Sequence, residues 1–233
     1  MSKESTSRIG AEGVVEGVKG KTKEVAGALI DDEDLREDGR AQQHKADEQR
    51  SAAKSEADAN GGAYMPLRIG IGLNTGPCVV GNMGSDFRFN YSVLGDTVNF
   101  ASRLEARTKD YRLPLVIGSR TAEGAKQKFA TMEIDLIQVK GKTQPEAVFA
   151  VLGRAEAEQD PRCGELRELN AQMLARFRKQ KWDETLSLID RCRKLADGFD
   201  VAGLYEMYVE RIETYRADPP GPDWDGVYEA ESK

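Results

Sequence analysis

The sequence predicts a mixed α/β fold in its central part, flanked by a charged N-terminal segment and an α-helical C-terminal extension. Three observations lead to this division. Residues 1–60 are rich in Lys, Glu, Asp, Ala and Gln and hold few large apolar side chains. Residues 67–152 contain short apolar runs of strand type, separated by turns and by two helical stretches. From Asp160 onward, apolar residues recur with the spacing of helices.

The N-terminal segment is expected to be disordered or only weakly helical. Its large apolar side chains are too few for burial to offset the entropy lost on ordering. A thin apolar stripe recurs at helical spacing, but glycines interrupt it. The turn sequence Asn60-Gly61-Gly62 marks the end of the segment, so we place the first region at residues 1–62.

The middle region is predicted to consist of strands, turns and two helices. We expect strands near 67–74, 78–81, 88–94, 114–117, 132–139 and 146–152, and helices near 97–108 and 120–127. In the first strand, apolar residues occupy every second position, which is typical of a half-buried strand. Gly70 and Gly72 in this strand would let a neighbouring chain or a nucleotide approach the backbone closely.

The C-terminal region, residues 160–233, is predicted to form three amphipathic helices followed by an extended tail. The helical stripes start at Leu166, Trp182 and Leu204. Residues 181–190 resemble the helix pair of a tetratricopeptide repeat, although a single copy cannot form a solenoid. The proline-rich run 219–228 is expected to lie extended on the domain, with Trp224 as its anchor.

Composition excludes several classes of function. A net charge of −6 over 233 residues gives no electrostatic basis for binding nucleic acid or an anionic membrane. No apolar run reaches the roughly 18 to 20 residues of a spanning helix, and the N-terminus lacks the apolar core of a signal peptide, so a cytoplasmic protein is expected. The chain has one histidine and three widely spaced cysteines, which argues against a zinc site or a disulfide framework.

The strongest candidate for chemistry is the helix predicted near residues 97–108. Asn99 and Arg103 lie four residues apart, so a helix projects both side chains from one face. Asp96 stands at the position expected for an N-cap, after Gly95 has ended the preceding strand. A neutral amide beside a planar guanidinium suits a sugar oxygen and a phosphoryl group. A solvated helix face is the alternative explanation of the same pair.

Four motifs in the middle region follow one another in a familiar order. They are Leu67-Arg-Ile-Gly-Ile-Gly-Leu-Asn-Thr-Gly76, Val79-Val-Gly-Asn-Met-Gly-Ser85, Tyr91-Ser-Val-Leu-Gly-Asp-Thr-Val-Asn-Phe-Ala-Ser-Arg-Leu-Glu105 and Val139-Lys-Gly-Lys142. Their order and spacing resemble the C-terminal half of a class III adenylyl or guanylyl cyclase catalytic domain. The resemblance implies a truncated domain over residues 63–153 with a partial ferredoxin-like palm. The implied activity is conversion of ATP or GTP to a cyclic nucleotide and pyrophosphate, in cyclic-nucleotide signalling.

The resemblance also implies roles for individual residues. Asn99 would position the ribose, and Arg103 would stabilise the α-phosphoryl transition state. Lys140 would reach the polyphosphate, with Lys142 as the near alternative. Ser92 stands at the position that helps to choose the purine, and its hydroxyl can donate or accept a hydrogen bond, so it excludes neither ATP nor GTP.

The family's metal ligands have no counterpart in this sequence. In the family, Mg²⁺ or Mn²⁺ is held by two aspartates from a strand and a hairpin upstream of the motifs quoted above. No such strand pattern precedes Tyr64, so both ligands are expected to be missing and the chain alone to be inactive. Class III sites form between protomers, which implies a homodimer or a heterodimer with an intact cyclase protomer.

A second resemblance concerns the N-terminal segment. Residues 20–40 resemble the CsbD-like general stress proteins, which are small hydrophilic helical chains. This resemblance supports an alternative function, a non-catalytic stress-response or protein-interaction module with a relic cyclase half. The missing aspartates favour the alternative for the chain alone, whereas the helix with Asn99 and Arg103 favours a cyclase ancestry.

Overall fold

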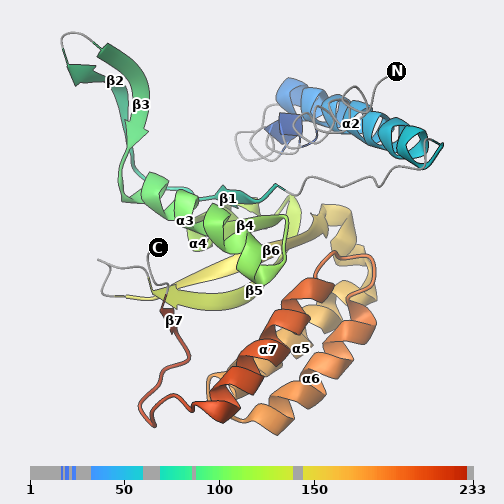
Figure 1. The fold of residues 1–233 in the computed structure, drawn as a ribbon, viewed down its shortest axis with the longest axis vertical. Coiled ribbons are helices and arrows are strands. Elements are labelled where there is room, and N and C mark those ends of the chain that lie inside the picture. The colour runs from blue at the N-terminus through green and yellow to red at the C-terminus, as the bar shows by residue number, and fades with distance from the viewer. Residues whose placement is uncertain are drawn as a thin grey trace. The chain divides into compact units, whose positions relative to one another are not determined.

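The chain separates into two units, Met1–Ile69 and Gly70–Lys233, and their elements are labelled in Figure 1. The structure is a computed structural model. It describes residues 17, 19–20, 23–24, 33–59, 69–85, 88–138 and 144–229. The second unit contains both the central sheet and the C-terminal helices, which share one hydrophobic core.

The first unit contains one long helix, α2, at Glu33–Ala59. The sequence predicts disorder or weak helicity here, and the structure has a helix of 27 residues. Its Ala, Glu, Lys and Gln residues are strong helix formers, so the helix forms with little apolar burial. Residues near Gly20 pack closely on α2, because a Cβ added at Gly39 would lie 2.5 Å from the Glu24 nitrogen. Gln43 Nε2 also donates a hydrogen bond to Glu24 Oε2 at 2.7 Å.

The second unit is built on a five-stranded mixed sheet with the strand order β1-β4-β6-β5-β7. The strands are β1 (Ile71–Leu73), β4 (Leu115–Gly118), β5 (Phe129–Gln138), β6 (Glu146–Arg154) and β7 (Tyr228–Glu229). β1 runs parallel to β4 and β7 runs parallel to β5, whereas β6 is antiparallel to both of its neighbours. A separate antiparallel hairpin projects away from this sheet (Figure 1) and consists of β2 (Val79–Ser85) and β3 (Arg88–Leu94).

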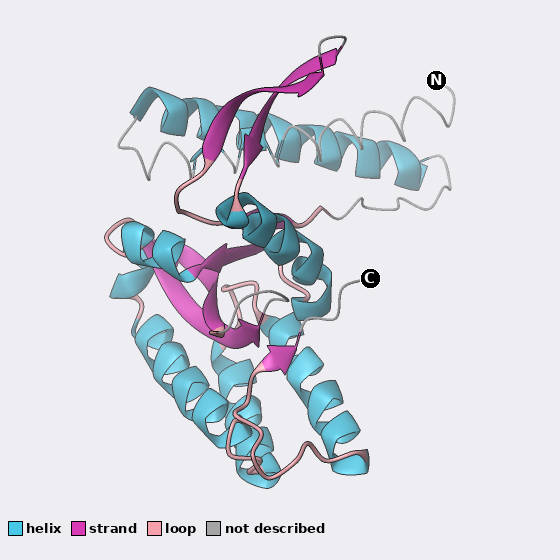
Figure 2. Ribbon diagram, turned by 90° about the vertical axis from the view of Figure 1, so that its left-hand side faces the viewer, coloured by secondary structure: helices cyan, strands magenta, loops and turns pink. Residues whose placement is uncertain are grey.

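Helices lie around this sheet in Figure 2 and cover its two faces unequally. They are α3 (Asp96–Tyr111), α4 (Ser119–Ala125), the 3₁₀ helix η1 (Ala155–Gln159), α5 (Pro161–Phe177), α6 (Trp182–Leu195) and α7 (Ala202–Ala217). Val116 of β4 joins the large core shared with α3, α5, α6 and α7. Its neighbours Leu115 and Ile117 point to the other face and pack with Ala122 of α4. No described helix is long and apolar enough to cross a membrane.

The structure confirms the predicted α/β fold with an α-helical C-terminal extension. Most predicted strands and helices differ from the observed ones by a few residues at their ends. The strand predicted at 78–81 continues to Ser85, and the strand predicted at 132–139 already starts at Phe129. The strand predicted at 67–74 pairs regularly with its neighbour only over Ile71–Leu73.

Two glycines at the start of the sheet bring helix α3 directly onto β1. A Cβ added at Gly72 would lie 2.3 Å from both the Ala101 carbonyl oxygen and the Glu105 nitrogen. A Cβ added at Gly70 would lie 1.8 Å from Thr108 Oγ1. The close neighbour of these glycines is therefore helix α3 of the same chain.

Trp224 holds the extended C-terminal tail on the helices. Its ring centroid lies 5.2 Å from that of Tyr215 and 5.5 Å from that of Phe177. The indole N–H donates a hydrogen bond to the Val227 carbonyl at 3.2 Å. The chain then continues into β7, where Tyr228 pairs with β5.

Candidate functional site

Helix α3 starts from a glycine cap. Gly95 occupies the N-cap position with φ of 146°, a conformation that glycine adopts without steric cost. Its carbonyl oxygen accepts hydrogen bonds from the Val98 and Asn99 amides at 3.0 and 3.1 Å. Asp96 is the first helical residue and Gly95 occupies the N-cap position, so the prediction of Asp96 as the N-cap is wrong. Its carboxylate still lies in the first turn, where negative charge is favourable.

Asn99 and Arg103 lie one turn apart on α3, so they project from the same side of the helix. Another side of α3 faces the core and buries Phe100, Leu104, Thr108 and Tyr111. Asn99 is exposed and Arg103 is half-buried, which leaves both accessible from outside the core. The pair therefore presents an amide and a guanidinium to whatever binds this side of the helix.

The loop after β1 fastens the N-terminal end of α3. Asn74 Nδ2 donates a hydrogen bond to the Thr97 carbonyl at 3.1 Å. The Thr97 hydroxyl in turn donates to the Pro77 carbonyl at 2.8 Å. The sequence prediction gave this loop no role, although the run Asn-Thr-Gly-Pro after a strand is a turn signal that could have drawn attention to it.

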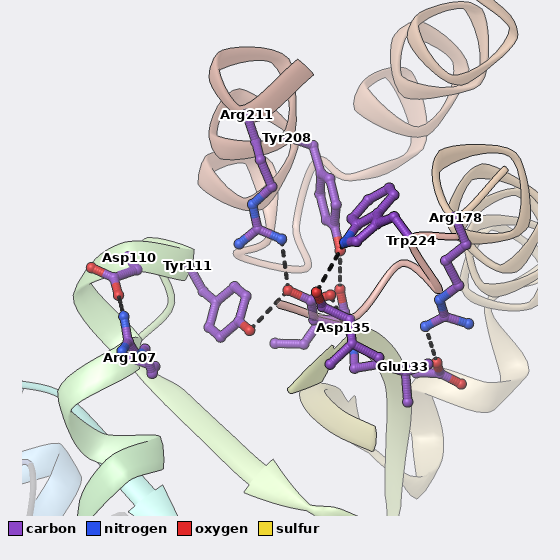
Figure 3. Close-up of polar contacts among 12 residues, drawn as sticks. Arg107, Asp110, Tyr111, Glu133, Asp135, Arg178, Tyr208, Arg211 and Trp224 are labelled. Carbon is purple, nitrogen blue, oxygen red and sulfur yellow. Dashed lines mark hydrogen bonds and ion pairs between the residues drawn. The ribbon is translucent and has the colours of Figure 1, made fainter. Parts of the chain in front are cut away.

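A buried polar cluster lies at the other end of α3, as Figure 3 shows. Asp135 of β5 accepts hydrogen bonds from the Tyr111 hydroxyl at 3.0 Å and from Arg211 Nη1 at 2.7 Å. The Asp135 and Arg211 side chains are only 2% and 10% exposed. Burial alone would lower the pKa of Arg211, but the Asp135 carboxylate, together with Tyr208 and Tyr111, outweighs burial and the pKa is raised. Burial, and then the nearby Asp135, raise the pKa of Tyr111, which therefore stays a neutral donor.

Arg112 ends α3 and joins it to α7. It adopts a left-handed conformation with φ of 56°. Its Nη1 donates to Glu206 Oε2 at 2.7 Å, and its Nη2 donates to both carboxylate oxygens of Glu210 at 2.7 Å. One turn earlier, the Arg107 guanidinium lies 5.5 Å from the ring centroid of Tyr228 in β7. The last turn of α3 is thus tied to both C-terminal elements.

Of the other predicted site residues, the structure describes Ser92. It lies on β3 opposite Gly81 of β2, and its side chain is half-buried. Lys140 and Lys142 belong to the β5–β6 connection, residues 139–143, which lies outside the described residues. Among the described residues, the structure therefore brings the amide of Asn99 and the guanidinium of Arg103 to one side of α3.

The β2–β3 hairpin carries an apolar surface that is open to solvent. Among the hairpin side chains whose burial the structure describes, the relative exposure of the large apolar ones runs from 39% for Val93 to 77% for Tyr91. The other exposed members are Val79, Val80 and Leu94. Apolar side chains grouped in this way are typical of a surface that contacts a partner.

The family resemblance implies a metal pair that is held by two aspartates. Within the described residues, no three His, Cys, Asp or Glu side chains come together in a group that could hold a metal ion. The buried Asp135 is occupied by Arg211 and Tyr111 instead.

Comparison with known proteins finds a family similarity in the middle of the chain. Residues 40–152 match the family model described as the adenylate and guanylate cyclase catalytic domain. The match begins within α2, upstream of residue 63, where the sequence suggested that the domain starts. This part of the chain is therefore similar to the catalytic domain of class III nucleotide cyclases.

Individual relatives include both kinds of cyclase. The chain is 26% identical over 163 residues to "Adenylate cyclase, terminal-differentiation specific" of Dictyostelium discoideum, which covers 66% of this chain and 8% of that protein. It is 31% identical over 98 residues to adenylate cyclase 1 of Rhizobium meliloti, covering 42% and 15%. It is 49% identical over 49 residues to human retinal guanylyl cyclase 1, covering 21% and 4%. The chain thus spans less than a fifth of the length of each of these curated relatives.

Among solved structures, the adenylyl cyclase CyaB from P. aeruginosa is similar to this chain with a TM-score of 0.45 and 22% sequence identity. The similarity covers 65% of this chain and 84% of that one.

Proposed function

We propose that this chain supplies the ribose- and phosphate-binding side of a class III cyclase site, with ATP or GTP as substrate. The observation that carries the proposal is the position of Asn99 and Arg103 on one side of a helix that is fastened at both ends. A helix held in this way presents its donors without reorganisation. Preorganised donors are what the charge developing in a transition state requires.

Each residue then has a definite task. The Asn99 amide orients the ribose through a hydrogen bond. The Arg103 fork donates to the α-phosphoryl oxygens as the 3′-hydroxyl attacks and pyrophosphate leaves. Lys140, or Lys142 in its place, binds the polyphosphate. Ser92 contacts the purine, and its hydroxyl suits adenine and guanine equally.

A second protomer completes the proposed site. The exposed apolar hairpin β2–β3 supports such a partner, because this surface would be covered in a dimer. The partner is another copy of this chain or an intact cyclase protomer. Only the intact protomer brings the carboxylates that hold Mg²⁺ or Mn²⁺ in the family, so we propose that the chain is inactive alone.

A second candidate function is a non-catalytic interaction module that keeps the cyclase domain as a dimerising surface. The same exposed hairpin favours it, because a binding surface needs no chemistry at Arg103. In this alternative, the CsbD-like segment at residues 1–62 and the tetratricopeptide-like helices carry further contacts in a stress response.

Complementation in a mixture tests the first proposal. The full chain is combined with a cyclase protomer that keeps its metal carboxylates but has its own Asn and Arg pair changed to Ala. Cyclic nucleotide should form from ATP or GTP with Mn²⁺ only when both chains are present. Arg103→Ala should then lower turnover about 10²- to 10³-fold, the usual cost of a lost transition-state donor. Arg103→Lys should recover little, because a point charge cannot reproduce the fork.

Lys109→Ala is the matched control, since Lys109 is an exposed cation on the same helix. Arg107 is unsuitable because it pairs with Asp110 and lies over Tyr228. Unchanged turnover in Arg103→Ala would count against the catalytic role. A mixture that associates in sedimentation but makes no cyclic nucleotide would favour the interaction module.

A further inference from the structure

One direct link between α3 and the C-terminal region is a forked ion pair on the surface. The Arg112 guanidinium donates hydrogen bonds to the carboxylates of Glu206 and Glu210 in α7, each at 2.7 Å. The two carboxylates are four residues apart, so they stand on one side of α7. A planar guanidinium that binds two carboxylates from one helix face fixes the angle between the two helices as well as their distance.

Backbone packing at the same point is close. A Cβ added at Gly203 would lie 2.6 Å from Arg112 Cβ and 3.1 Å from its carbonyl oxygen. The first turn of α7 therefore packs directly against Arg112, the residue at the C-terminal end of α3. Arg112 has the left-handed conformation that non-glycine residues rarely adopt, and such a conformation persists where surrounding contacts determine it.

Two further contacts hold the last turn of α3 from other directions. The Tyr111 hydroxyl shares the Asp135 carboxylate with Arg211 of α7. The ring centroid of Tyr228 in β7 lies 4.4 Å from the guanidinium of Arg211 and 5.5 Å from that of Arg107. Arg112 thus contacts α7 and Arg107 contacts β7, whereas Tyr111 reaches α7 through Asp135 of β5.

We infer that α7 and β7 set the rotation of α3 about its axis, and that Arg112, Glu206 and Glu210 are positioning residues for Asn99 and Arg103. An α-helix is stiff over the nine residues from Arg103 to Arg112, about 14 Å at 1.5 Å per residue, so a rotation fixed at one end is passed to the other. The biological meaning of this inference rests on the proposed function of Asn99 and Arg103.

Two variants break the link from opposite sides. Arg112→Asn removes the guanidinium but keeps a residue that tolerates the left-handed conformation. Glu206→Gln combined with Glu210→Gln removes the carboxylates without touching α3. Arg216→Gln is the matched control, because Arg216 lies on the same helix and pairs with Asp183.

The first readout is the orientation of α3 in the full chain without nucleotide. Residual dipolar couplings of α3 amides are compared with those of β5 and β6 amides. Both test variants should change the α3 couplings in the same sense and leave the strand couplings as they are, and the control should change neither. Unchanged α3 couplings in both test variants would overturn the inference, whatever happens to the melting temperature.

The second readout is turnover in the complementation mixture. Both test variants should lower kcat about 10- to 100-fold with KM unchanged, since small misplacement of a transition-state group acts on the chemical step. An altered α3 orientation with unchanged kcat would also overturn the positioning role. A wild-type mixture without turnover would refute the proposed function, and the couplings would then decide the inference by themselves.

Discussion

Arg211→Met should lower the free energy of unfolding of the second unit by about 3 to 5 kcal/mol, the usual cost of removing one partner of a buried ion pair. The pair meets the conditions for a cost of that size. Its side chains are 2% and 10% exposed, and Arg211 Nη1 lies 2.7 Å from Asp135 Oδ2. After the substitution, Asp135 would keep hydrogen bonds from the Tyr111 hydroxyl and the Leu136 amide but would lose its guanidinium.

A rescue experiment separates lost charge pairing from lost packing. Adding Asp135→Leu and Tyr111→Phe to Arg211→Met removes the buried carboxylate and the hydroxyl that donates to it. The triple variant should recover to within about 1 to 2 kcal/mol of wild type, because apolar replacement of a whole buried pair is often nearly neutral. Arg216→Gln serves as control, since its pair with Asp183 is 45% and 95% exposed and should contribute at most about 1 kcal/mol.

Urea unfolding followed by tryptophan fluorescence measures these differences. The chain has two tryptophans, Trp182 and Trp224, and both lie in the second unit, so the signal reports that unit alone. A loss below about 1 kcal/mol for Arg211→Met would mean that the pair behaves like an exposed one. A triple variant less stable than Arg211→Met would refute the argument from buried charge.

Three further predictions concern packing, pH and association. Gly72→Ala should cost about 1 to 3 kcal/mol because its methyl group would meet helix backbone, whereas Gly81→Ala, with no atom within 4 Å of an added Cβ, should leave the urea midpoint nearly unchanged. Burial raises the pKa of the Cys192 thiol from 9.0 to about 11, so the folded state keeps a proton that the unfolded chain releases. Stability should therefore fall as pH rises from 9 to 11, and Cys192→Ala should make this fall shallower; an equal slope would contradict the assignment. Val79→Ser with Leu94→Ser should weaken self-association about tenfold, equivalent to about 1.4 kcal/mol, at an unchanged melting temperature, and an unaltered sedimentation profile would count against the hairpin as an interface.

Local pattern accounts for most of what the sequence predicts correctly. Strands of the middle region alternate apolar residues, and the spacing of Asn99 and Arg103 is a property of any helix that contains them. Local pattern does not determine which residue caps the N-terminus of α3, because Gly95 and Asp96 are both residue types that favour the N-cap position. A positive φ at Gly95 decides between them, and no sequence pattern reports that angle.

Contacts between distant residues explain what sequence analysis misses. The residues that hold the end of α3 come from α7, and nothing near Arg112 in the sequence indicates its partners Glu206 and Glu210. Aspartate is a residue type that usually lies at the surface. Asp135 is nevertheless buried, because Arg211 and Tyr111 both donate hydrogen bonds to its carboxylate. Contacts of this kind between distant residues follow from the packing of the helices on the sheet, which the local sequence pattern does not report.

The separation of these contacts along the chain has a consequence for biosynthesis. Arg112 precedes Glu206 by 94 residues and Glu210 by 98, so α3 leaves the ribosome well before the helix that fixes it. Until α7 and β7 have emerged, the Asp135 carboxylate lacks its guanidinium and the surrounding core stays exposed to chaperones and proteases. A translation product that stops short of α7 would be removed as an unfinished chain. Helix α3 would therefore reach its final orientation only in molecules whose synthesis has passed β7.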